Sequence, residues 1–285
     1  MWAVARVTNT GGLRAVRAST ISTIVALIGV FAFTAVPNVA MAQEDAHRAW
    51  LGVALEKNDA GTVIAKHVVK ASPAARAGLA DGDALVEVEG IPITTPSQVI
   101  ARVVLAGPGS TINLRVRHGT INRTVSATLV AFPGPEEILR LDKVGTFAPD
   151  WSGATVVSGV LASNMAAIRG HVLIVDFWAS WCGPCRLMAP KLAQLHAMYG
   201  AQGLIVVGFT DDAPPHAAQS AQAMGMTYTV ASDTASRVAG DYGVTALPTL
   251  FVIDKRGVIR DVHVGYDPGG SGMLEKLIQT LVVEP

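Results

Sequence analysis

Cysteine is nearly absent from this chain, since Cys182 and Cys185 are the only two in 285 residues. A structural disulfide stabilises a fold mainly by closing a long loop, and the ring between these two residues would be very small. A structural zinc site would need four ligands, but the sequence has no second Cys-x-x-Cys and no close pair of histidines. Two thiols at this spacing can close and open a disulfide by exchange. The pair therefore predicts redox chemistry and no metal site.

An excess of charge of either sign is also missing, with 22 basic and 22 acidic residues. Without Arg6, Arg14 and Arg17, which lie in the first 42 residues, 19 basic residues remain against 22 acidic ones. This balance gives no electrostatic reason to expect nucleic acid or an anionic membrane surface as a partner.

No apolar run reaches the roughly 20 residues that a membrane-spanning helix needs. The run over residues 21–36 follows the three arginines and stops short of that length. Ala40-Met41-Ala42 then matches the small-residue pattern of a secretory cleavage site. Residues 1–42 are therefore predicted to be a signal peptide, which makes the mature protein periplasmic or otherwise exported. An uncleaved N-terminal membrane anchor is the alternative.

Two different modules are predicted after this segment. The remaining length, about 240 residues, is long for one domain and ordinary for two. Residues 131–137 contain two prolines around a glycine, followed by two glutamates, a composition that breaks both helix and strand. We therefore expect a first domain over 49–130, a linker with a short helix over 131–143, and a second domain over 144–285.

Residues 49–130 are predicted to be mostly strand. Short segments rich in Val, Ile and Thr suit a half-buried sheet. The expected strands are 51–55, 62–69, 84–88, 111–117 and 122–129. A Ser-Pro pair at 72–73 begins a short helix, and a capping box at 95–98 begins a second helix that runs to about Leu105.

In the order of its segments this domain resembles a PDZ domain of the kind attached to bacterial HtrA-like proteases. The resemblance rests on residues 50–53, 72–79, 81–85, 88–90 and the capped helix at 95–105. It implies that the loop around Gly52 binds a peptide's C-terminal carboxylate through backbone N–H groups, while the peptide adds a strand to the sheet. The expected peptide-binding residues are Leu51, Gly52, Val53, Val99 and Val103. On the helix, Val99, Ile100 and Val103 lie at helical spacing, and one or two of them are expected to line the pocket. They also fit ordinary core positions, and this alternative stays open.

In the second domain, a continuous apolar run at 172–178 precedes the cysteine pair. Such a run is typical of a strand buried on both faces of a parallel sheet. Residues 181–185 then read Trp-Cys-Gly-Pro-Cys. The elements expected after them are a helix over 186–199, a strand over 204–209, a helix over 216–224, a hairpin of 250–253 and 257–264, and a closing helix over 273–282.

This pattern resembles the thioredoxin fold, and its layout is similar to the exported TlpA/ResA-like branch. The resemblance rests on residues 175–185, on Ala-Pro-Asp-Trp at 148–151 and on the insertion between 209 and 250. It implies an α/β thioredoxin fold, a central mixed sheet flanked by helices, preceded here by the mostly-β PDZ domain. It also implies a thiol-disulfide oxidoreductase that uses no cofactor.

The thioredoxin resemblance assigns roles to the two thiols. Cys182 is expected to be the attacking nucleophile, because a helix N-terminus favours its thiolate. Cys185, one turn into the helix, is expected to be the resolving thiol. The expected neighbours of the pair are Trp181, Gly183, Pro184 and Leu247. Trp181 is expected either to shield the disulfide or to serve only as a packing residue.

Asp176 lies inside the buried strand, where a carboxylate is costly unless it is paired or neutral. Burial should raise its pKa, which would suit a proton acceptor for Cys185. The thioredoxin resemblance places a proton-transfer aspartate at this position. An aspartate that is merely hydrogen-bonded at the end of the strand is the alternative.

Residues 245–249, Thr-Ala-Leu-Pro-Thr, match the thioredoxin cis-proline loop. Pro248 is therefore expected to follow a cis bond, with the backbone of Leu247 beside Cys182. A trans proline at the start of a strand is the alternative. Gly265 is expected to keep the same surface open.

The predicted function is an exported reductase of protein disulfides, with the PDZ module recruiting a substrate or partner by its C-terminus. The Gly-Pro dipeptide and the apolar Leu247 resemble reducing thioredoxins, so a membrane electron-transfer partner would have to re-reduce the pair. An oxidase or isomerase on the same scaffold stays an alternative, because about 30 mV shifts the equilibrium tenfold. A redox-switched PDZ adaptor is a second one. A peroxidase is disfavoured, because the peroxiredoxin-type Pro-x-x-x-Thr-x-x-Cys segment is absent.

Overall fold

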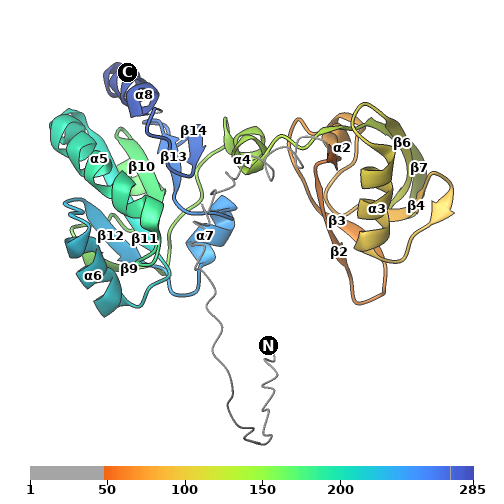
Figure 1. Ribbon diagram of the computed structural model, residues 1–285, viewed down its shortest axis with the longest axis horizontal. Helices are drawn as coiled ribbons and strands as arrows, with labels where there is room; N and C mark the ends of the chain where they lie inside the picture. Colours follow the sequence, from red (N-terminus) through yellow and green to blue (C-terminus); the bar gives the residue numbers. More distant parts are fainter. Residues whose placement is uncertain (1–47, 270) are drawn as a thin grey trace, which may run out of the picture. The chain divides into compact units, whose positions relative to one another are not determined.

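The computed structural model describes residues 48–269 and 271–285, so the predicted signal peptide at 1–42 lies outside the described residues. Figure 1 shows two modules along the chain. Across the described residues, no helix has both the length and the apolar character that crossing a bilayer requires.

The N-terminal module is an antiparallel sheet with two helices. Its strands are β1 (Ala49–Trp50), β2 (Val53–Lys57), β3 (Val63–Val68), β4 (Ala84–Val88), β5 (Ile91–Pro92), β6 (Thr111–His118), β7 (Ile121–Thr128) and β8 (Val130–Ala131), and its helices are α2 (Pro73–Arg76) and α3 (Pro96–Ala106). The main sheet has the order β2-β3-β4-β6-β7, with β5 added to β4, while β1 pairs with β8. Strand β2 therefore lies at an edge of the main sheet.

Local sequence signals account for the elements of this module. The side chain of Ser72 accepts a hydrogen bond from the Ala75 amide at the start of α2, and a capping box opens α3, as expected. The strand expected over 51–55 begins only at Val53. Gly52 has φ of +82°, a left-handed conformation that a strand does not contain.

The C-terminal module contains a second sheet flanked by helices. Its strands are β9 (Thr155–Ser158), β10 (Val172–Phe177), β11 (Leu204–Thr210), β12 (Thr229–Ser232), β13 (Thr249–Ile253) and β14 (Ile259–Val264). Its helices are α4 (Pro135–Lys143), α5 (Gly183–Tyr199), α6 (Pro214–Ala223), α7 (Arg237–Tyr242) and α8 (Ser271–Val283), with 3₁₀ turns η1 (Met165–Ile168) and η2 (Gly200–Gln202).

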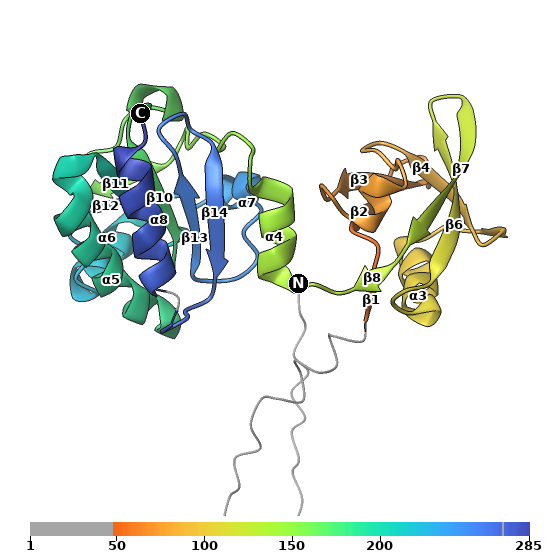
Figure 2. The same cartoon turned by 90° about the horizontal axis from the view of Figure 1, so that it is seen from above.

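The sheet of this module is mixed and has the order β14-β13-β10-β11-β12-β9. Strands β10, β11 and β12 run parallel, whereas β13 and β14 are antiparallel to their neighbours and β9 is antiparallel to β12. Figure 2 shows α5, α6 and α8 over one face and α4 and α7 over the other. This arrangement is the thioredoxin fold predicted from the sequence.

Strand β10 is the centre of the module and contributes to a core on each face. Val172 and Ile174 belong to the cluster packed under α5, α6 and α8. Leu173 and Val175 belong to the opposite cluster, which includes residues of α4 and α7. All six residues of β10 are buried, as the apolar run predicted.

Besides the two 3₁₀ turns, three elements of this module were not expected from the sequence, namely β9, β12 and α7. The segment expected as a linker, 131–143, is largely structured, since Ala131 ends β8 and α4 occupies its second half. Arg140 on α4 donates from Nε to Asp261 on β14 over 3.1 Å. This bond attaches α4 to the C-terminal module.

Candidate active site

The cysteine pair lies where β10 gives way to α5. Cys182 is the N-cap residue of α5, and the backbone N–H of Cys185 donates to Cys182 Sγ over 3.2 Å. The two sulfurs form a disulfide, and both residues are buried. The unpaired N–H groups of a helix N-terminus stabilise negative charge, so this position favours a thiolate at Cys182 once the disulfide is reduced.

The residues between the cysteines form the first turn of α5. The helix begins at Gly183, earlier than the expected start at 186, because the Cys182 side chain caps it. Pro184 occupies the first turn, where a helix does not need the missing N–H. The turn between the two sulfurs is therefore held by helical geometry.

Asp176 is placed on the α5 face of the sheet by the alternation of β10, because Val172 and Ile174 also face that side. The residue is only 2% exposed. Burial raises the pKa of Asp176 to about 7, and a hydrogen bond from Tyr228 opposes that rise. A carboxyl with this pKa can take up or release a proton near neutral pH.

The proline loop has the expected cis bond between Leu247 and Pro248. The Gly265 amide donates to the carbonyl oxygen of Pro248 over 2.8 Å, which joins the start of β13 to the end of β14. A Cβ atom at Gly265 would meet no atom within 4 Å, so space is open there. Leu247 is half-buried and contacts the cores on both faces.

Trp181 is exposed over 75% of its surface, so it is not a core residue. Its indole lines a cavity of about 310 Å³ together with Trp178, Phe209 and Leu247. The cavity is therefore bounded by the residue that precedes Cys182 and by the proline loop. Its aromatic lining suits an apolar side chain.

Asp212, a residue that the sequence analysis did not single out, fixes the backbone that leads to Cys182. Its carboxylate accepts hydrogen bonds from the Ser180 amide at 2.8 Å and the Ser180 hydroxyl at 3.0 Å. Arg186 on α5 donates to the Ser180 carbonyl oxygen over 2.7 Å. The backbone two residues before Cys182 is thus fixed on both sides. Only its position next to a predicted strand end pointed to this role.

In the N-terminal module, the loop before β2 has the backbone orientation that anion binding requires. The carbonyl oxygen of Leu51 accepts from the Ala74 amide, and that of Gly52 accepts from the Val69 amide, both at 2.9 Å. In a trans peptide the next N–H points the opposite way. The amides of Gly52 and Val53 therefore face away from those partners. Gly52 is required here, because a Cβ atom would lie 2.2 Å from Ser72 Cβ.

The helix residues expected to line the peptide groove are placed differently. Val99 and Val103 are buried in the core of the module, with 1% and 6% exposed. The apolar residues that α3 exposes are Ile100 and Val104, 57% and 48% exposed, and the terminal Leu105. The open alternative for Val99 and Val103 is the one observed, since the stripe at helical spacing is the buried face of α3.

Metal-ligating residues do not gather in the described part of the chain, where no group of three or more His, Cys, Asp or Glu side chains could hold an ion.

Two family models match this chain. The model described as the AhpC/TSA family matches residues 144–262, and the PDZ domain model matches residues 49–129.

Individual relatives match the C-terminal module. Thioredoxin-like protein YneN of Bacillus subtilis is 33% identical over 124 residues, which are 42% of this chain and 71% of the relative. Thiol-disulfide oxidoreductase ResA of Geobacillus thermodenitrificans is 30% identical over 125 residues, 43% of this chain and 70% of the relative. Among solved structures, a thiol:disulfide interchange protein of the thioredoxin family from Chlorobium tepidum is 29% identical, with a TM-score of 0.43 over 50% of this chain and 99% of that one.

Proposed function

The chain belongs to the thioredoxin-like thiol-disulfide oxidoreductases that include YneN and ResA, and we propose that it reduces protein disulfides after export while its PDZ module recruits the protein to be reduced. The observation that carries this proposal is the cysteine pair at the start of α5, with Asp176 buried on the same face of the sheet. The proposed division of the chain is a signal peptide at 1–42, the PDZ module at 49–130 and the redox module at 144–285.

The proposed reaction starts from the reduced pair. The Cys182 thiolate attacks one sulfur of the substrate disulfide, which forms a mixed disulfide and releases the other substrate sulfur as a thiolate. The Cys185 thiol gives its proton to Asp176, and the resulting thiolate attacks Cys182 Sγ. The second substrate thiolate leaves, and the disulfide observed in the structure is formed. Two electrons pass from the cysteine pair to the substrate, whose sulfurs leave as thiolates; Asp176 can return its proton to one of them, and solvent protonates the other.

Two features support reduction as the direction. The Gly183-Pro184 dipeptide and the apolar Leu247 resemble those of reducing thioredoxins. Each turnover leaves the pair oxidised, so the cycle needs an electron source. An exported compartment supplies few small reductants, and a membrane protein that transfers thiol electrons is the proposed donor.

Recruitment by the PDZ module is supported by the loop and by the sheet edge beside it. The outward amides of Gly52 and Val53 can bind a C-terminal carboxylate, and the edge strand β2 can pair with an extended peptide. The exposed Ile100 and Val104 on α3 replace Val99 and Val103 as the proposed apolar contacts. The module would thereby raise the local concentration of substrate at the cysteine pair.

The experiment that tests this proposal measures reduction of a disulfide-bonded reporter protein by the purified chain, with dithiothreitol as the electron source. Two reporters are compared, one ending in an apolar residue with a free carboxylate and one with an amidated C-terminus. The chain should reduce both, and the free carboxylate should lower the KM. Replacement of Cys182 and Cys185 by serine should abolish reduction and preserve peptide binding. Full biological activity of that double variant would instead identify a PDZ adaptor, and faster oxidation than reduction of reporters would identify an oxidase.

A further inference from the structure

Asp176 has an unusual neighbour in the sheet. In the parallel register, Asp176 on β10 lies beside Gly208 on β11, and Gly208 lies beside Val230 on β12. Val206 and Val230 both pack in the core under α5, so Gly208 and Val230 lie on the same face of the sheet as Asp176. Glycine is disfavoured inside a strand, and its presence there often marks a close approach by another group.

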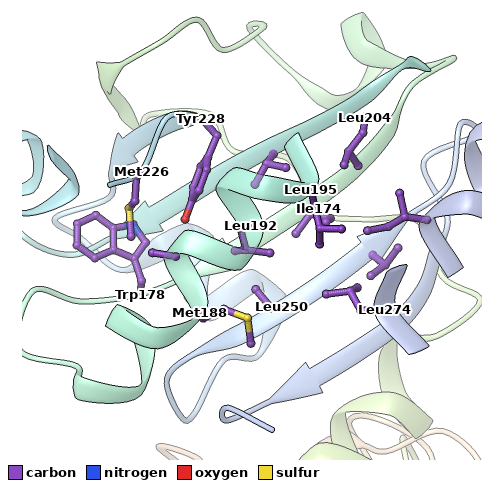
Figure 3. Close-up of a cluster of buried hydrophobic side chains, with 14 of the residues drawn as sticks. Ile174, Trp178, Met188, Leu192, Leu195, Leu204, Met226, Tyr228, Leu250 and Leu274 are labelled. Carbon is purple, nitrogen blue, oxygen red and sulfur yellow. The ribbon is translucent and has the colours of Figure 1, made fainter. Parts of the chain in front are cut away.

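The group that approaches Gly208 is a pair of aromatic rings. A Cβ atom at Gly208 would lie 3.0 Å from Trp178 Nε1 and 3.4 Å from Cε2 of Tyr228. Any larger side chain at this position would therefore displace one of the two rings. Figure 3 shows Tyr228 in the buried cluster, with its hydroxyl directed into the cluster on the side of Trp178. The absence of a side chain at Gly208 makes room for the Tyr228 ring over the sheet.

In this space Tyr228 reaches Asp176. Its hydroxyl donates a hydrogen bond to Oδ2 of Asp176 over 3.2 Å, and both residues are 2% exposed. Burial and the nearby carboxylate raise the pKa of Tyr228 well above its ordinary value, so the phenol stays a proton donor at neutral pH. Within the described residues, Oδ1 of Asp176 has no hydrogen-bond partner, so Oδ2 is the anchored oxygen and Oδ1 is available to a proton.

The other elements on this face bring few titratable groups to Asp176. The N-terminal end of α5 brings Cys182, its N-cap residue, and Cys185 to the same core, and α6 and α8 contribute apolar residues such as Ala221 and Ile278. The pKa of Asp176 accordingly responds to burial and to the Tyr228 hydrogen bond. Tyr228 is therefore the one side chain among the described residues that opposes the cost of ionising Asp176.

We propose that Tyr228 is a positioning residue for disulfide exchange, which holds the Asp176 carboxylate in the orientation that accepts the Cys185 proton. Gly208 leaves the space over the sheet that the Tyr228 ring occupies. This inference rests on the proposed function, because the position of Asp176 matters to turnover only if Asp176 takes that proton. Neither Tyr228 nor Gly208 carries a signal in the sequence that connects it with the cysteine pair.

The test replaces Tyr228 with phenylalanine, which removes the hydroxyl and keeps the ring beside Gly208. Because this hydrogen bond stabilises the charged carboxylate, its loss should raise the pKa of Asp176 by about one unit. At pH 7 the ionised fraction would then fall from about a half to about a tenth, and the rate of exchange by about fivefold. The rate should recover at pH 9. Carbon-13 NMR titration of the Asp176 carboxyl and the pH profile of exchange measure the two effects.

A matched control is Tyr242→Phe in the same module. Tyr242 is also fully buried, and its hydroxyl donates to the carbonyl oxygen of Pro149 over 3.0 Å, away from Asp176. This variant should lose the stability that any buried tyrosine loses when its hydroxyl is removed, and it should leave the titration of Asp176 unchanged. If Tyr228→Phe does not fold, fluorotyrosine at position 228 keeps the shape and makes the hydroxyl a stronger donor. The pKa of Asp176 should then fall.

The outcomes separate this inference from the proposed function. If Asp176→Asn shifts the pH profile of exchange but Tyr228→Phe behaves as Tyr242→Phe does, the role of Tyr228 is refuted and that of Asp176 stands. If Asp176→Asn leaves the profile unchanged, the proton-acceptor step of the proposed function is refuted instead. A raised Asp176 pKa together with a slower rate at pH 7 that recovers at pH 9 supports the inference.

Discussion

Replacing Asp176 with asparagine is expected to stabilise the oxidised protein at pH 8 while it slows disulfide exchange. The two effects have one cause, because the wild-type site keeps an ionisable group where burial disfavours its charge. Asparagine has nearly the same shape and cannot ionise. The variant therefore removes both the cost of the charge and the ability to accept a proton.

The size of the stabilisation follows from the pKa values. The pKa of Asp176 is about 7 in the folded protein against an ordinary value of 3.8. A difference of about three units corresponds to about 4 kcal/mol of unfolding free energy at high pH. Because the folded-state pKa is the higher one, the unfolded chain loses its proton first as the pH rises. Wild-type stability therefore falls between about pH 4 and pH 7, and the cost is fully present above pH 7.

The assay is urea denaturation of the oxidised wild type and of Asp176→Asn at pH 4 and pH 8. The two proteins should differ little at pH 4, and the variant should be more stable by up to about 4 kcal/mol at pH 8. Asp254→Asn is a contrasting control, since burial would raise the pKa of Asp254 but hydrogen bonds from Val258 and Arg256 lower it overall. That variant should lose stability at pH 8. An equal stability difference between Asp176→Asn and wild type at both pH values would refute the reasoning.

Two further predictions come from single contacts. Asp212→Ala should lower the free energy of unfolding in urea by about 1–3 kcal/mol and slow exchange, because it leaves the Ser180 amide without its acceptor. Replacing its exposed neighbour, Asp211→Ala, should change stability by less than about 0.5 kcal/mol. Equal effects of the two substitutions would contradict the anchoring role of Asp212. Gly52→Ala should abolish peptide binding and destabilise the module by more than about 3 kcal/mol, since its Cβ atom would overlap a neighbouring side chain. Gly61→Ala, with a similar φ of +79° and only an ordinary contact of its Cβ atom with the flexible Lys57 side chain at 3.6 Å, should cost only about 1–2 kcal/mol and leave calorimetric peptide binding intact.

Both folds could be read from the sequence because their signals are local. The buried run of β10, the cysteine spacing and the caps of α2 and α3 each depend on neighbouring residues, and the structure confirms them. Strands β9 and β12 were missed because each is only four residues long, and β12 also lies in the insertion between 209 and 250. Their assignment depends on pairing across the sheet, which no local pattern contains.

The parts of the site that the sequence did not show are those made by distant contacts. Tyr228 lies 52 positions from Asp176 and Asp212 lies 32 positions from Ser180, so only the folded sheet brings each pair together. On α3 the helical spacing of Val99 and Val103 identified an apolar stripe but could not show which face was open. Periodicity predicts that a face is apolar, and the packing of the other elements decides whether it is buried.

The most direct test of the proposed direction is the redox equilibrium of the purified chain against glutathione. Trapping free thiols by alkylation and counting the modified Cys182 gives the ratio of dithiol to disulfide at each glutathione potential. A reductase should have a potential more negative than that of glutathione, with the Cys182–Cys185 disulfide persisting in reduced glutathione. A dithiol form favoured under the same conditions would show that the protein donates disulfides and would contradict the assignment as a reductase.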